Sequence, residues 1–310
     1  MRYLVPGWLA LTIFLSACHP MIAPTPQPVA TPTPSPLPVT QTPDLGGGRL
    51  LALNGRTLYL SCVGNKKPTV LLEAGLGADH TSWDQVQPAL APLARVCSYD
   101  RAGLGASAPA SMPRTGADVV QELHQLLAVA GESGPYILVG HSFGGLFMRL
   151  FAHAYPTEVA GIILVDAVHE DWWARAAALL PPVTDNEEPQ LRSFRRYVTL
   201  EYADPAQTPE GIDIRVTATQ LQAVKTLGNT PLLVLVAGVP LLGDGVLAAE
   251  LTAQLNQLLQ ETLPEALTHL STQSLRITVD HSGHNIPKEQ PQVVVAAIRT
   301  LIDVVCQTGC

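Results

Sequence analysis

The feature that most restricts the fold of this chain is a series of short, largely apolar runs separated by segments with helical periodicity. The runs typical of strands are 69–73, 95–99, 136–139, 162–165, 232–236 and 275–279. Most are apolar without alternation, which is typical of strands buried on both faces. In 117–130 and 289–305, apolar residues recur at helical spacing instead. The pattern predicts an α/β fold, with a mostly parallel sheet flanked by helices.

An antiparallel hairpin is predicted where the folded part begins. Segments 49–53 and 56–62 have the composition of strands, and Asn54-Gly55 lies between them. Asn-Gly is a strong hairpin signal because both residues tolerate positive φ. We therefore expect an antiparallel edge on the otherwise parallel sheet.

The N-terminus has the pattern of a targeting leader. Arg2 is charged and residues 3–17 are not, and this uncharged stretch is shorter than the ~20 residues that span a bilayer. The tetrapeptide Leu-Ser-Ala-Cys at 15–18 resembles the lipoprotein signal of bacteria, in which the cysteine is acylated. The resemblance implies a signal peptide over 1–17 and a lipid on Cys18. An ordinary cleaved signal peptide and an uncleaved N-terminal anchor are the alternatives.

A proline- and threonine-rich segment follows the leader. Residues 20–43 contain nine prolines and no charged side chain, a composition that cannot bury enough apolar surface to fold and that favours extended polyproline II. It predicts a tether over 18–43, followed by one globular domain over 44–310. With the lipid on Cys18, the protein is expected in the bacterial cell envelope, anchored to the membrane and facing the extracytoplasmic side.

The net charge argues against a nucleic-acid partner. The chain has 18 Lys and Arg against 26 Asp and Glu, a formal charge of −8 at pH 7. Nucleic-acid binding needs a basic surface that neutralises phosphates. We expect a small-molecule substrate instead, and the sequence leaves the oligomeric state open.

The pentapeptide Gly-His-Ser-Phe-Gly at 140–144 has the pattern of a nucleophile turn. It fits G-x-S-x-G and lies between a strand, 136–139, and a helical segment, 144–155, as that motif requires. Such a tight turn strains the serine backbone, and the two glycines let the neighbouring backbones approach. The following helix directs its N–H groups and positive dipole end to the same place. Ser142 is therefore the candidate nucleophile.

Several segments together resemble the α/β-hydrolase family over residues 50–305. Besides the serine pentapeptide they are 70–77 (VLLEAGLG), 100–105 (DRAGLG) and 282–284 (SGH), and 208–213 (TPEGID) is similar to a lid stretch of some bacterial hydrolases. The resemblance implies an eight-stranded α/β-hydrolase sheet with a helical lid after the sixth strand, at about 168–230. It also implies an oxyanion hole formed by the backbone N–H groups of Leu76 and Phe143.

A serine nucleophile needs a nearby imidazole, because its hydroxyl is a poor nucleophile at its free pKa. His284 lies in a glycine-containing loop after the last strand, where the order Ser…Asp…His places the base. His281 is the alternative, and His141 lies inside the turn and is expected to point away from the serine. Asp280, His281 and His284 lack a further ligand set at zinc spacing, so we expect no metal.

Two aspartates are candidates for the carboxylate that orients the histidine. Asp166 directly follows 162–165, where some relatives, including certain haloalkane dehalogenases, carry the acid. Asp244 lies in a Gly-Asp-Gly turn after 232–236, close to the position that is commoner in the family. Both strands end at the same edge of the sheet, so either carboxylate can reach the imidazole. Asp166 is preferred, and Asp244 is the alternative acid.

Four cysteines lie in the globular part. In the hydrolase fold the second and fourth strands are neighbours, so the resemblance implies a disulfide between Cys62 and Cys97. Cys306 and Cys310 are four residues apart, and we expect a second, local disulfide there. Four cysteines permit three pairings, and the sequence does not choose among them.

These features favour a serine hydrolase that cleaves carboxylic esters through an acyl-enzyme, without a cofactor. An amidase, peptidase or acyltransferase on the same fold is an alternative, because the lid decides the substrate. A surface-anchored binding lipoprotein with an idle triad is another. The serine argues against dehalogenation and epoxide opening, which use an aspartate nucleophile in this fold.

Overall fold

The computed structural model describes residues 47–307. The leader, Cys18, the whole tether and Cys310 lie outside these residues. The signal peptide, the lipid and the pairing of Cys306 with Cys310 therefore stay predictions. None of the described helices combines the length and the apolar composition needed to cross a membrane.

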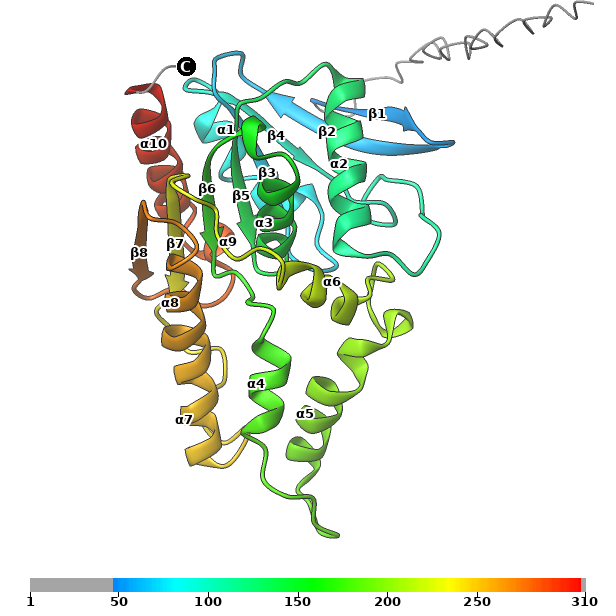
Figure 1. Ribbon diagram of the computed structural model, residues 1–310, viewed down its shortest axis with the longest axis vertical. Helices are drawn as coiled ribbons and strands as arrows, with labels where there is room; N and C mark the ends of the chain where they lie inside the picture. Colours follow the sequence, from blue (N-terminus) through cyan, green and yellow to red (C-terminus); the bar gives the residue numbers. More distant parts are fainter. Residues whose placement is uncertain (1–46, 308–310) are drawn as a thin grey trace, which may run out of the picture. The chain divides into compact units, whose positions relative to one another are not determined.

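The described residues contain an eight-stranded sheet with the order β1-β2-β4-β3-β5-β6-β7-β8 (Figure 1). The strands are β1 (Gly48–Leu53), β2 (Arg56–Val63), β3 (Thr69–Glu73), β4 (Arg95–Tyr99), β5 (Tyr136–His141), β6 (Val159–Val165), β7 (Leu232–Ala237) and β8 (Ser274–Val279). β2 pairs antiparallel with both β1 and β4, whereas the other neighbouring pairs are parallel. The predicted mostly parallel sheet with an antiparallel edge is confirmed.

The hairpin between β1 and β2 turns at Asn54 and Gly55, whose φ angles are 50° and 80°. Leu53 pairs with Arg56, so these two residues form the whole loop. Two successive positive φ angles are typical of a type I′ turn, whose twist matches that of the flanking strands. The hairpin predicted from Asn-Gly is confirmed.

Helices cover both faces of the sheet. They are α2 (Gly116–Ala130) and α3 (Gly144–Ala154) on one face, and α1 (Gln87–Leu90) and α10 (Pro291–Gln307) on the other; η1 (His80–Trp83), η2 (Pro156–Glu158) and α9 (Ile286–Glu289) are short connections. Leu138 of β5 belongs to the core that α3 covers, whereas its neighbour Ile137 belongs to the core that α10 covers. This burial on both faces explains why the central strands are apolar without alternation.

A cap extends beyond the ends of β6 and β7. Its first part, between these strands, comprises α4 (Trp172–Ala178), α5 (Pro189–Thr199), η3 (Glu201–Ala203), η4 (Pro205–Gln207) and α6 (Ile214–Leu221). Its second part, between β7 and β8, comprises α7 (Ala249–Gln257), the π-helical turn η5 (Leu258–Thr262) and α8 (Leu263–Thr268). Figure 1 shows α4, α5 and α7 extending away from the sheet, and α4 contacts η5. Only the first part was expected from the sequence.

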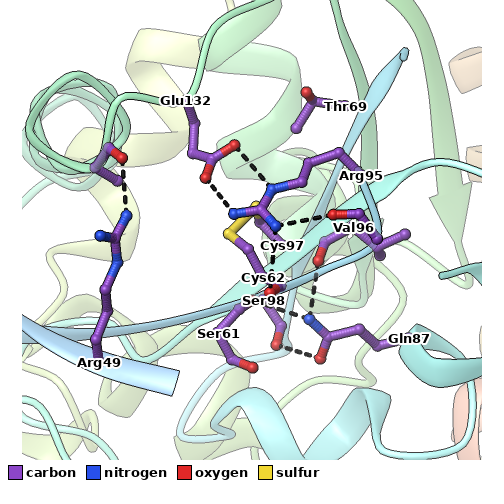
Figure 2. Close-up of a disulfide and its surroundings, with 12 residues drawn as sticks. Arg49, Ser61, Cys62, Thr69, Gln87, Arg95, Val96, Cys97, Ser98 and Glu132 are labelled. Carbon is purple, nitrogen blue, oxygen red and sulfur yellow. Dashed lines mark hydrogen bonds and ion pairs between the residues drawn. A yellow bond between two sulfur atoms is a disulfide. The ribbon is translucent and has the colours of Figure 1, made fainter. Parts of the chain in front are cut away.

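Cys62 and Cys97 form a disulfide between β2 and β4, where the two residues are direct partners in the strand register. Figure 2 shows the bridge beside Arg95, whose guanidinium donates to the Glu132 carboxylate. Next to Cys97 in β4, the backbone carbonyl oxygen of Val96 accepts from the side-chain amide of Gln87 in α1 (3.0 Å). The disulfide thus joins the antiparallel edge to the first parallel pair of the sheet.

Candidate active site

Ser142 lies in the turn between β5 and α3, with a φ of 52°. Its backbone N–H donates to the Val165 carbonyl oxygen (3.0 Å), and its own carbonyl oxygen accepts from Gly145 and Val168 (both 3.1 Å). A positive φ is unfavourable for a residue other than glycine and persists where surrounding bonds hold it. The turn therefore presents the hydroxyl at the carboxyl edge of the sheet.

The glycines around Ser142 are required by the close approach of neighbouring backbone. A Cβ on Gly140 would lie 2.7 Å from Gly144 backbone atoms, and one on Gly144 would lie 2.6 Å from the carbonyl oxygens of Glu73 and Ala74. The Cβ atoms of real side chains essentially never come within 3.0 Å of such non-bonded backbone atoms. The steric reason given for the G-x-S-x-G pattern therefore holds at both glycines.

His284 lies between Ser142 and Asp166. Its Nε2 is 2.9 Å from Ser142 Oγ, and its Nδ1 is 2.6 Å from Asp166 Oδ2. An ionised carboxylate can only accept a hydrogen bond, so the hydrogen of the neutral ring is on Nδ1 and Nε2 is free to accept from the serine hydroxyl. This is the tautomer that a general base for Ser142 needs.

Asp166 directly follows the last residue of β6 and has a φ of 42°. Its backbone N–H donates to the Leu235 carbonyl oxygen (2.7 Å), and its Oδ1 accepts from the Ala237 N–H (2.9 Å). Both partners are in β7. The neighbouring strand therefore holds the carboxylate in place, with Oδ2 left for His284.

The other acid and base candidates do not reach Ser142. Asp244 is exposed in the loop between β7 and α7, and among the described residues it makes no hydrogen bond to His284. His281 is exposed and has a φ of 60°. Of the candidates named from the sequence, the structure brings together Ser142, His284 and Asp166.

His141 is buried beside His284, and its Nε2 lies 2.8 Å from the backbone carbonyl oxygen of that residue. A carbonyl oxygen only accepts, so His141 Nε2 carries the hydrogen and donates it. Burial and, to a smaller extent, the nearby His284 together lower the pKa of His141 to about 4. The ring is therefore neutral near pH 7 and holds the main chain of His284 in place.

The Leu76 and Phe143 N–H groups are available for a ligand. Phe143 follows Ser142 directly, and Leu76 belongs to the loop after β3, where a Cβ on Gly75 would lie 3.3 Å from Ser142 Cβ. Neither N–H has an acceptor among residues 47–307. Leu76, Phe143 and Ser142 line the same cavity, and two such N–H groups beside a serine nucleophile can stabilise the negative oxygen of a tetrahedral intermediate.

A cavity of about 350 Å³ extends from Ser142 into the cap. Trp172 and Trp173 of α4 line it on one side, and Leu259 of η5 and Pro264 of α8 contribute from the second part of the cap. The Trp173 ring stacks on Tyr202, with 5.3 Å between centroids and 11° between planes. The volume is that of a small-molecule site, and its walls are mainly apolar.

Nothing in the sequence predicts the ionic cluster that lies beside Leu76. Arg101 is buried and donates to the carboxylates of Glu73 and Glu210. Each of the three is a charged residue within an apolar or glycine-containing segment, and that is the signal that could have drawn attention to them. The sequence does not indicate that they meet, because Glu210 comes from the cap, 109 residues after Arg101.

Two groups of the described residues have the composition of a metal site, and in one of them, Cys62, Cys97 and Glu132, the two cysteines form a disulfide. Asp79, His80 and Asp100 place ligand atoms within 4.8 Å of one another. However, Asp79 accepts from the Thr81 N–H, and Asp100 accepts from the N–H groups of His80 and Ala106. These bonds cap η1 and the loop after β4, so we assign the cluster a structural role.

Comparison with known proteins matches the chain to one fold. Residues 68–217 match the family model described as alpha/beta hydrolase fold. The uncharacterized protein YqjL of Bacillus subtilis (strain 168) is 29% identical over 246 residues, which cover 79% of this chain and 87% of YqjL. An uncharacterized protein of Schizosaccharomyces pombe is 37% identical over 138 residues, and the match spans only 26% of that protein and 36% of this chain.

Among solved structures, a thermophilic esterase from Thermogutta terrifontis is similar, with a TM-score of 0.55 and 23% identity. The match covers 86% of this chain and 97% of the esterase. At this identity the likeness concerns the fold.

Proposed function

We propose that this chain, which has the α/β-hydrolase fold, is a serine hydrolase that acts on carboxylic esters. The observation that carries the proposal is the chain of two hydrogen bonds from Ser142 through His284 to Asp166, 2.9 and 2.6 Å long, at the floor of a mainly apolar cavity. A nucleophile, a base and an orienting acid in this order are the requirements for acyl transfer through serine.

In the first half of the proposed reaction, Ser142 Oγ attacks the ester carbonyl carbon while His284 Nε2 takes the hydroxyl proton. The carbonyl oxygen becomes negative and accepts from the N–H groups of Leu76 and Phe143. Asp166 stabilises the imidazolium that forms. His284 then gives the proton to the leaving alcohol oxygen, and its bond to carbon breaks, so the acyl group remains on Ser142.

In the second half, water takes the place of the alcohol. His284 removes a proton from the water, whose oxygen attacks the acyl carbon, and the same two N–H groups hold the oxyanion. The proton returns to Ser142 Oγ as the acyl bond breaks. The carboxylic acid leaves, and the free enzyme is restored.

The cavity supports an uncharged acyl or alcohol group of modest size. A volume of about 350 Å³ holds about a dozen non-hydrogen atoms if each occupies roughly the 30 Å³ of a water molecule. Trp172, Leu259 and Pro264 on its walls favour apolar groups. We therefore propose esters with short or medium acyl chains as the substrate class.

The test measures p-nitrophenyl butyrate turnover and labelling by a fluorophosphonate probe. Ser142→Ala is expected to abolish both, and Asp166→Asn to lower kcat by roughly 10³- to 10⁴-fold, because the amide no longer favours the required tautomer of His284. Asp244→Asn is the matched control and is expected to leave kcat unchanged. Full turnover by Ser142→Ala would remove the proposal, as would an absence of labelling in the unaltered protein.

A further inference from the structure

The cap segment 208–213 has a carboxylate directed into the protein. Glu210 in this segment is only 3% exposed and does not line the cavity above Ser142. Its carboxylate accepts two hydrogen bonds from Arg101, from Nε at 2.6 Å and from Nη2 at 2.7 Å. This parallel pair of bonds fixes the orientation of the guanidinium as well as its position.

Arg101 uses its remaining donors on the loop that follows β3. Nη1 donates to the Ala74 carbonyl oxygen at 2.9 Å and to the carboxylate of Glu73, and Nη2 donates to the Gly75 carbonyl oxygen at 2.6 Å. The side chain of Arg101 is 2% exposed. A buried cation therefore holds two successive carbonyl groups of the loop that carries Leu76.

The Gly75 carbonyl oxygen accepts from Arg101 at 2.6 Å and from the Ala78 N–H at 3.2 Å, and these bonds determine where the Leu76 N–H points. The two groups belong to the same peptide unit, which is planar and trans, so the N–H points opposite to the C=O. Because Arg101 draws the Gly75 oxygen into the protein, the Leu76 N–H is directed away from Arg101. That N–H has no acceptor among the described residues, and Leu76 lines the cavity with Ser142.

Glu210 also binds the peptide unit that follows Leu76 directly. Its Oε1 accepts from the Gly77 N–H at 2.9 Å. Gly77 has a φ of 70°, and a Cβ there would lie 3.0 Å from the Pro209 ring. The contact to Gly77 is additional to the ion pair, because Glu210 could pair with Arg101 without binding the loop itself. The peptide units on both sides of Leu76 are thus held by one carboxylate, directly or through Arg101.

The segment that carries Glu210 is itself fixed to the rest of the protein. The Arg114 N–H donates to the Gly211 carbonyl oxygen at 2.8 Å, and the Asp213 N–H donates to the Arg114 carbonyl oxygen at 2.7 Å. The Asp213 side chain then accepts from the Val216 N–H and caps α6. These bonds hold segment 208–213 of the cap, and with it Glu210, at a defined position.

We propose that Glu210 is a positioning residue of the active site: through Arg101 and the Gly77 N–H, it aims the Leu76 N–H at the oxyanion. The inference rests on the proposed function, because it assigns Glu210 to the oxyanion hole of that reaction. It makes the catalytic loop dependent on a residue of the cap.

The test compares Glu210→Gln with Glu187→Gln in the full chain. Glu187 is also a buried cap carboxylate paired with an arginine, Arg195, and it neither lines the cavity nor contacts the loop after β3. Both variants lose one buried charge of the cap. Glu73 remains paired with Arg101 in both variants, and only Glu210→Gln removes the second carboxylate charge on Arg101 and alters the acceptor of the Gly77 N–H.

Two readouts are measured for each variant: kcat and KM for p-nitrophenyl butyrate, and the inhibition constant of a trifluoromethyl ketone, which forms an oxyanion when a serine adds to it. For Glu210→Gln we expect kcat to fall about 10- to 100-fold, less than the ~10²- to 10³-fold loss of an oxyanion donor. We expect KM to change by less than about threefold, since ground-state binding uses the cap walls. The ketone should bind more weakly by the same factor as kcat/KM falls.

Unchanged kcat and ketone affinity in Glu210→Gln would overturn the inference, as would an equal loss in Glu187→Gln. If Glu210→Gln does not fold, Gly77→Ala serves as the second variant, because it strains the loop and presses on Pro209 while all ion pairs remain. The same selective loss of kcat is expected there. A lack of Ser142-dependent turnover in the unaltered protein would instead reject the proposed function and this inference together.

Discussion

Single residues of the site are held in conformations that a free chain avoids. Ser142 and Asp166 both have left-handed φ angles, 52° and 42°, which typically cost about 1–3 kcal/mol each. The N–H groups of both residues donate to strand carbonyl oxygens, those of Val165 and Leu235, and these bonds hold them there. Strain at two of the three proposed catalytic residues indicates that the surrounding sheet, more than the local sequence, maintains the geometry.

His141 gives a prediction at this scale. The folded state lowers its pKa to about 4, whereas in the unfolded chain it is ~6.5. Between these two pH values the unfolded state binds a proton that the folded state does not. The contribution of His141 to the free energy of unfolding is therefore fully present above about pH 6.5 and is lost as the pH falls toward 4. The shift corresponds to about 3 kcal/mol.

We expect His141→Gln to reduce the loss of unfolding free energy between pH 6.5 and pH 4 by about 3 kcal/mol, since the amide can still donate to the His284 carbonyl but does not titrate. Urea denaturation at a series of pH values measures it. His281→Gln, at an exposed histidine, is the control and should follow the unaltered protein. An unaltered pH profile in His141→Gln would contradict the prediction.

At the scale of elements, the site depends on where strands end and on what crosses over them. β5, β6 and the loop before α9 bring Ser142, Asp166 and His284 to one edge of the sheet, as expected for parallel strands. The cavity above that edge has walls from both cap parts. The crossover between β7 and β8 thus covers the sheet with α8 and also lines the site through η5.

We expect Leu259→Trp, in η5, to shorten the preferred acyl chain, because the larger side chain fills part of the cavity. The ratio of kcat/KM for p-nitrophenyl octanoate to that for the butyrate should fall by about tenfold, the order of magnitude for a pocket that loses one or two methylene contacts. Leu275→Trp is the control, since Leu275 is 56% exposed on β8 and outside the cavity. An unchanged ratio in Leu259→Trp would show that the acyl chain of the substrate does not bind beside Leu259.

At the scale of the whole molecule, the disulfide closes a long segment of chain. Cys62 and Cys97 are 35 residues apart, and the intervening chain includes β3 with the loop that carries Leu76. Closing a loop of this length restricts the unfolded chain by about 4 kcal/mol in the chain-entropy treatment. The bond itself lies at the antiparallel side of the sheet, away from Ser142.

The double variant Cys62→Ala with Cys97→Ala is therefore expected to lower the unfolding free energy by about 2–5 kcal/mol while kcat at 25 °C stays within about twofold. Denaturant unfolding and p-nitrophenyl butyrate turnover measure the two quantities. The unaltered protein under reducing conditions should show the same loss of stability. A large fall in kcat in the folded variant would mean that the bridge supports the catalytic loop directly.

Local patterns were sufficient for several features of this protein. Asn54-Gly55 predicted its hairpin because only residues that tolerate positive φ allow a two-residue turn. Gly140 and Gly144 marked the turn of Ser142 because backbone comes within 2.6–2.7 Å of any Cβ there. The constraint on the hairpin lies within two residues of the chain and that on Gly140 within five, whereas at Gly144 the approaching backbone belongs to Glu73 and Ala74.

Tertiary structure alone decided the rest. Asp166 and Asp244 were both compatible with the sequence, and the choice depended on the Ala237 N–H of a neighbouring strand, which holds one of the two carboxylates. Glu210 meets the Gly77 N–H across 133 residues of chain, a contact that leaves no periodicity or motif behind. Such features arise from which ends of strands and cap segments meet in space, and that depends on the packing of the whole domain.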